Sequence, residues 1–311
     1  MNRALGLHLG VLALLAALNY ALPAYHHGNL ARVMVLASYA MGYNLLFGYT
    51  GLLSLGHAMF FGAGLYGMGL AVRHLGLPVA PAFLLGILAA LALSAIVGFL
   101  ALRTAGVAFM IVTLMFSQAG YLTVLYFNEF TRGDEGFVIQ RSARRLAGLD
   151  LSDQNVRYFA ALALMAAVLL FLLWFVRSPT GRVLIAIREN EDRARMLGYD
   201  IFRHKLLAVV LSGGIAGMAG AVYGILFGYV GASFTTVQYS IFPLLWVLLG
   251  GAGTVLGPFV GTLFMFYLID YAADLTDAYM LVAGAALVLL TLFARSGIMG
   301  ELRKKALPWL P

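Results

Sequence analysis

Long apolar segments separated by short polar ones run through the whole chain. Segments of about 17 to 25 apolar residues are long enough to cross the hydrocarbon core of a bilayer as helices, because that core is about 30 Å thick. The pattern predicts ten spans, at residues 5–22, 30–47, 52–72, 79–101, 105–127, 158–176, 206–230, 241–256, 257–270 and 278–294. For residues 241–270, the alternative is one span and a re-entrant piece, which would move the C-terminal tail to the other side of the membrane unless another boundary shifts. We expect residues 1–311 to form one all-α transmembrane domain.

The distribution of Lys and Arg predicts which ends of these spans face the cytoplasm. Two polar stretches, residues 128–157 and 177–205, interrupt the apolar pattern. With a cytoplasmic N-terminus, ten spans place residues 177–205 and the tail from Arg295 inside, and residues 128–157 outside. Of the 20 basic residues, 13 then lie inside, in keeping with the excess of Lys and Arg in cytoplasmic loops. We therefore predict a multi-pass membrane protein with both termini in the cytoplasm.

Composition narrows the function classes further. Charged residues make up 11% of the chain and the mean hydropathy is +0.93. The net charge is +7, but the basic residues lie between apolar segments, where they orient helices in the membrane. We therefore expect no nucleic-acid partner. The chain has no cysteine, which excludes disulfides and cysteine-based metal sites, and we expect neither a metal nor a cofactor. The N-terminus also has the layout of a secretory signal peptide, which we interpret as the first span.

Glycine is concentrated in three apolar segments, residues 48–67, 212–224 and 250–261. In the middle segment, small residues favour close packing of helices within the membrane. The first and third segments combine glycine with hydroxyl residues or proline, a pattern typical of interrupted helices whose free backbone groups face a cavity. They lie in opposite halves of the chain, as expected if two repeats meet at a central path. The similar stretches AGLYG (63–67) and AGAVYG (219–224) suggest such an internal repeat.

A polar island begins at Ser178 and ends at Gly198. Ser178 followed by proline predicts a helix start, and Asn190 predicts the cap of a second helix of about two turns, roughly 10 Å long. Glu191 and Arg195 are spaced to form an i, i+4 ion pair, and Gly198 is suited to a left-handed helix stop. The short helix has the size of a plug for a groove on another protein. The alternative is an ordinary solvated connector.

The segment SPTGRVLIAIRENEDRARMLGYD resembles the cytoplasmic loop of permease subunits in branched-chain amino acid ABC importers of the LivM/LivH type. In that family the element E-x-x-A-x-x-x-G forms the coupling helix held by the ATPase, and here it is Glu191, Ala194 and Gly198. Three further blocks are similar to family signatures: YNLLFGYTGLLSLGHAMFFGAGLY (43–66), LRTAGVAFMIVTLMFSQ (102–118) and LLGGAGTVLGPFVGTL (248–263). Leu53 departs from the family pattern, because many relatives carry a polar residue there, and this leaves the solute open.

The resemblance implies a permease of the type II-like ABC importer fold in a bacterial inner (plasma) membrane. Its implied partners are ABC ATPase subunits, a second homologous permease subunit, an extracytoplasmic solute-binding protein and membrane lipid. The implied solutes are branched-chain amino acids, with urea, short amides or other amino acids as alternatives. No G-x-x-x-x-G-K-[ST] loop occurs, so ATP hydrolysis must come from a partner and we expect no enzyme activity in this chain. The implied ATPase-coupling residues are Gly181, Arg188, Glu189, Asn190, Glu191, Ala194 and Gly198.

A translocation path is expected along the interrupted helices. Candidate residues are Thr50, Gly51, Ser54, Gly56, His57, Phe61, Thr113, Gly251 and Gly253. His57 is an ionisable group at membrane depth and either marks the path or hydrogen-bonds broken backbone. For Thr50, Ser54 and Thr113 the alternative is bonding to helical backbone or between helices, and for Phe61 it is packing.

Two other function classes are weaker. An ion-coupled secondary transporter needs carboxylates within the membrane, and Asp and Glu lie in loops or at span edges. A membrane enzyme needs an orienting acid near Ser54 and His57, and none is close in sequence. On the importer hypothesis, replacing Glu191 or Gly198 with a bulky or oppositely charged residue should abolish uptake and leave membrane insertion intact.

Overall fold

The computed structural model describes residues 2–146, 148–293 and 296–305, and it is helical nearly throughout. Ten apolar helices carry the predicted spans: α1 (Asn2–Ala21), α2 (Ala24–Asn44), α3 (His57–Leu75), α4 (Val79–Ala101), α5 (Val107–Tyr126), α7 (Gln154–Arg177), α10 (Ile201–Phe227), α11 (Val237–Gly250), α12 (Gly257–Leu275) and α13 (Tyr279–Phe293). Among the described residues, seven helices are long and apolar enough to cross a membrane. The chain is an all-α membrane protein, as predicted.

Helix α10 lies at the centre of the bundle and packs against α2, α3 and α4. Its glycines allow this contact. A methyl group at Gly217 would collide with Cβ of Ala90, and one at Gly220 would collide with the carbonyl of Phe61. The middle glycine segment therefore packs helices closely, which confirms the packing interpretation.

The first and third glycine segments interrupt their helices. Helix α2 continues as one π-helical turn (Leu45–Tyr49), and irregular backbone then runs to Gly56 before α3 begins. Helix α11 ends at Gly250 and α12 begins at Gly257. The predicted spans 52–72 and 241–256 were therefore wrong in detail, because the first began and the second ended inside a helix break. Gly51 and Gly251 have φ values of +78° and +117°, which residues with a side chain rarely adopt, so the helices stop there.

The predicted outer loop, residues 128–157, is mostly irregular, with short elements. These are α6 (Asn128–Thr131), β1 (Phe137–Val138), a 3-10 turn (Arg141–Ala143), β2 (Arg145–Leu146) and β3 (Leu149–Asp150). Strand β1 pairs antiparallel with β4 (Tyr229–Val230), which is followed by a 3-10 turn (Ala232–Thr235), and β2 pairs with β3. The loop ends at Asp153, earlier than predicted, because the Asp153 carboxylate accepts hydrogen bonds from the first backbone N–H groups of α7.

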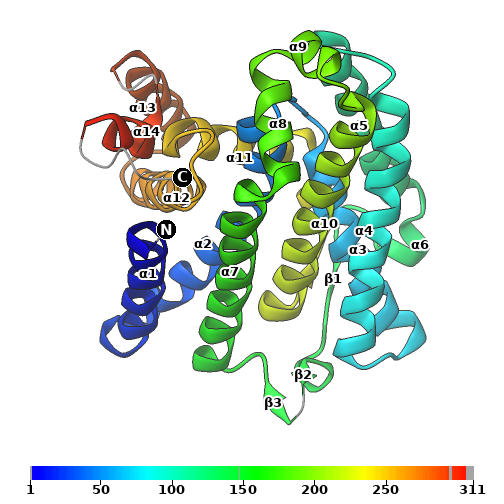
Figure 1. The fold of residues 1–311 in the computed structure, drawn as a ribbon. Coiled ribbons are helices and arrows are strands. Elements are labelled where there is room, and N and C mark those ends of the chain that lie inside the picture. The colour runs from blue at the N-terminus through cyan, green and yellow to red at the C-terminus, as the bar shows by residue number, and fades with distance from the viewer. Residues whose placement is uncertain (1, 147, 294–295, 306–311) are drawn as a thin grey trace.

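The predicted polar loop, residues 177–205, is also largely helical. It contains α8 (Pro179–Glu189) and α9 (Glu191–Met196), and α10 already begins at Ile201, five residues before the predicted boundary. In Figure 1, α8 and α9 stand at one end of the bundle and the β2–β3 hairpin at the opposite end. The last described helix, α14 (Gly297–Lys305), lines a cavity together with Arg188 of α8, so it lies at the α8 end.

Candidate functional site

Side-chain caps start both helices of the polar island, which we call the elbow (residues 178–200). Ser178 Oγ accepts a hydrogen bond from the Gly181 backbone N–H at 3.1 Å and begins α8. Asn190 Oδ1 accepts one from the Arg193 N–H at 2.8 Å and begins α9. Each cap satisfies an N–H group that the first helical turn leaves free. Both predicted helix starts are confirmed.

Gly198 ends α9 in the left-handed conformation, with φ of +88°. The Tyr199 N–H donates to the carbonyl of Ala194 at 3.3 Å, and the Gly198 N–H donates to that of Arg195 at 3.0 Å. These two bonds form a Schellman motif, in which the residue after the helix must adopt positive φ. The predicted left-handed stop is confirmed, and a side chain at position 198 would strain it although the space around it is open.

A small apolar cluster, separate from the main core, holds the elbow together. Its members are Val183 and Ile187 of α8, Ala194 of α9 and Ile201 of α10, each no more than 8% exposed. Because Ala194 is buried between three helices, its small side chain sets how closely α9 approaches α8 and α10. The alanine of the E-x-x-A-x-x-x-G element thus has a packing role inside the elbow.

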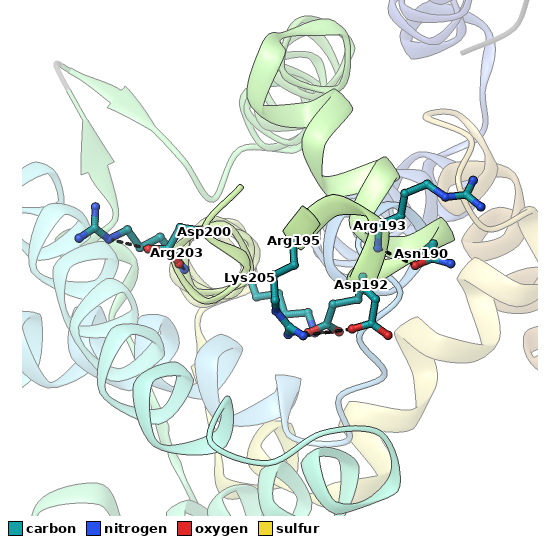
Figure 2. A network of polar contacts seen from close by, with 8 residues as sticks. Asn190, Asp192, Arg193, Arg195, Asp200, Arg203 and Lys205 are labelled. Atoms are coloured by element: carbon teal, nitrogen blue, oxygen red, sulfur yellow. Dashed lines mark hydrogen bonds and ion pairs between the residues drawn. The ribbon is translucent and has the colours of Figure 1, made fainter. Parts of the chain in front are cut away.

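Glu191 joins α9 to the base of α10. Its carboxylate lies 3.2 Å from Arg195 within the same helix, as predicted, and 2.6 Å from Nζ of Lys205. Figure 2 shows the side chains of Arg195 and Lys205 converging from these two helices. The Lys205 side chain is only 14% exposed, so this pair is better shielded from solvent than a surface ion pair. By contrast, Asp192 pairs at 3.0 Å with Arg195 inside α9, and both of these side chains are exposed. Exposed pairs of this kind contribute little to stability.

The two helix breaks meet in the interior, and we call their meeting point the junction (residues 44–56 and 251–256). The Asn44 side chain, 1% exposed, donates from Nδ2 to the Thr254 carbonyl at 2.9 Å. Its Oδ1 accepts from the Gly253 N–H at 3.0 Å. One amide therefore satisfies a donor and an acceptor that the break after α11 leaves free. Both glycine segments are interrupted, as predicted, and their breaks contact each other. The central path and the internal repeat stay predictions.

Arg188, near the end of α8, connects the elbow to the junction. Its Nη1 donates a hydrogen bond to the carbonyl of Gly48 in the first break. A Cβ atom built at Gly51 would lie 3.0 Å from Cγ of Arg188, and one at Gly253 would lie 3.0 Å from its Nη1. The Arg188 side chain thus contacts both breaks, at positions where only hydrogen occupies the side-chain site. Its neighbour Glu189 is exposed.

His57, fully buried at the start of α3, cross-links three helices. Its Nε2 lies 2.7 Å from Ser212 Oγ of α10, and Ser212 Oγ donates to the Gly42 carbonyl of α2 at 2.6 Å. Because the Ser212 proton goes to Gly42, Nε2 of His57 must carry the proton and donate to Ser212. Among the described residues, Nδ1 of His57 has no partner. The expected bond to nearby broken backbone was wrong; the partner is a side chain on α10.

The hydroxyl groups near the first break bond to backbone. Thr50 Oγ1 donates to a carbonyl of the preceding helical turn at 2.9 Å, and Ser54 Oγ accepts from the Gly56 N–H at 3.2 Å. Thr113 of α5 accepts from the Leu55 N–H at 3.2 Å and so ties α5 to the break. These contacts agree with the backbone-bonding alternative for all three hydroxyls. Their role in a translocation path stays a prediction.

Phe61 lies inside an aromatic cluster of α2, α3, α10 and α11. It is fully buried, with ring centroids 5.0 to 6.1 Å from those of Tyr39, Tyr223, Phe234 and Tyr239. This arrangement agrees with the packing alternative. Of the remaining path candidates, Gly251 is buried and Gly51 is exposed near the elbow.

Sequence reasoning missed three polar residues that organise this region: Asn44, Ser212 and Ser240. Ser240 Oγ of α11 accepts from the Ala58 N–H at 2.8 Å and caps the first turn of α3. The signal that could have found them is their position, because a polar side chain inside an apolar span needs a partner within the protein.

Broken membrane helices joined to a solvent-exposed helical elbow define a polytopic membrane protein of the transporter class. The sequence profile of the family described as "Branched-chain amino acid transport system / permease component" matches residues 27–291, and the chain belongs to this family of ABC importer permeases. The permease protein LivM of the high-affinity branched-chain amino acid transport system of Escherichia coli K12 is 29% identical over 289 residues, covering 86% of this chain and 68% of that protein.

Two shorter similarities extend the comparison. A probable branched-chain amino acid transport permease protein LivM of Methanocaldococcus jannaschii is 35% identical over 108 residues, which is 34% of this chain and 31% of that protein. The autoinducer 2 import system permease protein LsrC of Klebsiella pneumoniae is 34% identical over 109 residues, which is 33% of this chain and 31% of that protein. No solved structure matches the chain.

Proposed function

We propose that this chain is a permease subunit of an ATP-driven importer for branched-chain amino acids and that the elbow couples it to a separate ATPase. The observation that carries the proposal is Arg188, which reaches from α8 to both helix breaks. Closure of the ATPase subunits would shift the elbow. Because Arg188 contacts both breaks, the shift would reach the two interrupted helices together and alter the path between them.

The elbow has the construction that a moving lever needs. Its own apolar cluster and the Glu191–Lys205 pair fix α9 to α8 and α10, so a force on α9 is carried as a rigid-body motion. Without such internal contacts, a push on a six-residue helix would be absorbed by local bending. The same contacts explain why an elbow exposed to water is nevertheless well formed.

The matched test of coupling uses the two neighbouring acidic residues of α9. Glu191→Arg breaks the tie to α10 and places two cations together, so we expect solute uptake to be abolished while membrane insertion is unchanged. Asp192→Arg makes the same charge change at an exposed site whose partner lies within α9, and should retain most uptake. A bulky residue at Gly198 should act like Glu191→Arg. Full uptake by Glu191→Arg would refute the coupling role.

The proposed partners are two ATPase subunits, a second homologous permease subunit and an extracytoplasmic binding protein. Tagging this chain, extracting it from its native membrane in mild detergent and identifying co-purifying proteins by mass spectrometry tests the assembly. Recovery of an ATPase and a second permease is the expected result. If the chain came out alone or as a homodimer at every detergent strength, a secondary transporter would become the leading function.

Branched-chain amino acids are the proposed solutes because the names of the matched family and of both LivM relatives specify them. The similarity to an autoinducer 2 permease keeps other solutes open, including urea, short amides and other amino acids. Uptake of labelled leucine into vesicles containing the assembled importer, with each alternative solute as competitor, tests the choice. Competition by leucine, isoleucine and valine alone is the expected pattern.

We propose a bacterial inner-membrane location, with the elbow and both termini in the cytoplasm. The excess of Lys and Arg at the elbow supports this orientation. Because the chain has no cysteine, one introduced at Met196, which is 86% exposed on α9, gives a unique label. A membrane-impermeant maleimide should label Met196→Cys only after the membrane is opened. A cysteine in place of Tyr126, the last residue of α5 and 81% exposed, should label in intact cells.

A further inference from the structure

A cavity of about 540 Å³ lies at the elbow end of the bundle, between α8, the break after α11, and α14. Three cationic side chains line it, those of Arg188, Arg303 and Lys304, together with the hydroxyl residues Thr254 and Ser296. Cavities of this volume hold small ligands in other proteins. The lining comes from three segments far apart in the sequence, so the fold itself assembles the cationic groups.

The positive charge in this cavity is mostly uncompensated. Glu301 lies 3.9 Å from Nζ of Lys304, which also donates a hydrogen bond to Ser296 Oγ. Arg188 donates to the Gly48 carbonyl, which is a neutral partner. Within the described part of the chain, neither Arg188 nor Arg303 forms an ion pair. Among the described residues, the three cationic groups therefore share one ion pair, between Lys304 and Glu301, at the long distance of 3.9 Å.

We propose that this cavity binds the phosphate group of an anionic ligand. Guanidinium and ammonium groups form strong charge-assisted hydrogen bonds to phosphate oxygens, and the hydroxyl groups of Thr254 and Ser296 supply further polar contacts. Basic pockets between membrane helices on the cytoplasmic side are typical binding sites for acidic lipid headgroups. Binding itself requires neither the solute nor the ATPase, but the cytoplasmic orientation of this end of the bundle and the regulatory role of the site rest on the function proposed above.

Two sources supply such a phosphate: the headgroup of an acidic phospholipid, or a free phosphate anion. The surroundings of α14 favour the lipid. A hollow of about 590 Å³, lined by apolar and tyrosine side chains of α12 from Val260 to Tyr271, reaches Ile298 on α14. It offers room for acyl chains beside the same short helix whose last turn carries Arg303, Lys304 and Lys305.

Occupancy of this site would bear on the junction. Arg188 both lines the cavity and contacts the two helix breaks, so a bound phosphate would restrain the side chain that joins them. An anionic ligand would thereby stabilise one arrangement of elbow and junction over another. The cavity is thus assigned as a regulatory lipid site of the permease.

The test titrates the complex, purified with its co-purifying subunits and stripped of lipid, with three probes: dioctanoyl phosphatidylglycerol, dioctanoyl phosphatidylcholine and inorganic phosphate. Thermal unfolding and direct binding are measured in parallel. We expect phosphatidylglycerol to bind and raise Tm, and phosphatidylcholine to do neither. Tighter binding and a larger rise in Tm with phosphatidylglycerol than with inorganic phosphate would assign the site to lipid; the reverse order would assign it to free phosphate.

The matched variants are Arg303→Gln and Lys305→Gln, which remove the same charge from the same helix, inside and outside the cavity lining. Arg303→Gln should weaken binding of the occupying probe about tenfold, as expected for one lost charged hydrogen bond. Lys305→Gln should leave binding within about twofold of wild type, and Arg303→Lys should restore part of the loss. Equal binding by Arg303→Gln and Lys305→Gln, or no binding of phosphatidylglycerol and phosphate by wild type, overturns the proposal.

Discussion

The elbow and the junction are both polar regions of an apolar protein, and they are built in opposite ways. In the elbow, caps and ion pairs join residues a few positions apart, and most of the charged groups are exposed. In the junction, Asn44 bonds to backbone groups 209 and 210 positions away, and the amide is buried. Arg188 is the side chain that touches both.

The difference between the two regions indicates that buried hydrogen bonds contribute more to the free energy of folding than exposed ion pairs do. A lost exposed ion pair is replaced by water at little cost, whereas a buried donor or acceptor without its partner keeps its full desolvation penalty. The junction should therefore control the stability of the whole bundle, and the elbow should control a local motion.

The largest effect is expected from Asn44→Leu. The substitution leaves the buried Thr254 carbonyl and the half-buried Gly253 N–H without their partner, which should lower the free energy of unfolding by about 1 to 3 kcal/mol. Equilibrium unfolding in mixed detergent micelles measures the loss. Asn155→Leu makes the same chemical change at an exposed position of α7 and should cost much less. Equal losses in both variants would show that the hydrogen bonds of the Asn44 side chain do not contribute to stability.

Ala194→Asp should act on the elbow alone. A carboxylate buried in the small cluster of α8, α9 and α10 should destabilise the elbow by at least about 2 kcal/mol and leave the main core intact. Hydrogen exchange of α8 and α9 amides should accelerate, with no change in α10 beyond its first turns. Met196→Asp places the same group at an exposed site of α9 and serves as control. Accelerated exchange throughout the bundle would contradict a separate role for the elbow.

The smallest effect concerns the loop at residues 128–157, where local polar contacts converge on one carboxylate. Hydrogen bonds from Ser152, with a further one from Arg141, lower the pKa of Asp150 to about 2. Since the folded-state pKa is depressed, the contribution of Asp150 is present above its unfolded value of about 3.9 and lost as pH falls through about 2. Protection of this loop from proteolysis should be equal at pH 7 and 5 and decline from about pH 4 downwards. Asp150→Asn should remove that dependence; an unchanged pH profile in this variant would refute the assignment.

The same contrast explains how much could be read from the sequence. The caps by Ser178 and Asn190, the Glu191–Arg195 pair and the stop at Gly198 follow local rules, and all four were predicted correctly. The ten apolar segments were also found, because hydrophobic length needs no tertiary information. Boundaries failed where a cap or a glycine, not hydropathy, sets the limit of a helix: Asp153 begins α7, and Gly51 follows the end of the π-helical turn after α2.

The contacts of the junction could not be predicted because they depend on the tertiary fold. Glycine clustered with hydroxyl residues or proline predicted two interrupted helices, but nothing local to Asn44 says that its partners are Gly253 and Thr254. His57 shows the same limit: its position was notable, and its partner Ser212 lies 155 residues away on α10. Polar pairs between residues far apart in the sequence can be identified only from the tertiary structure, which determines which helices are neighbours.

The most direct test of the account is the ratio of solute molecules taken up to ATP molecules hydrolysed in the reconstituted importer carrying Arg188→Gln. If Arg188 transmits motion from the elbow to both helix breaks, as we propose, the variant will assemble and hydrolyse ATP while uptake per ATP falls far below that of the wild type. An Arg188→Gln importer with a wild-type ratio of uptake to hydrolysis would contradict this proposal.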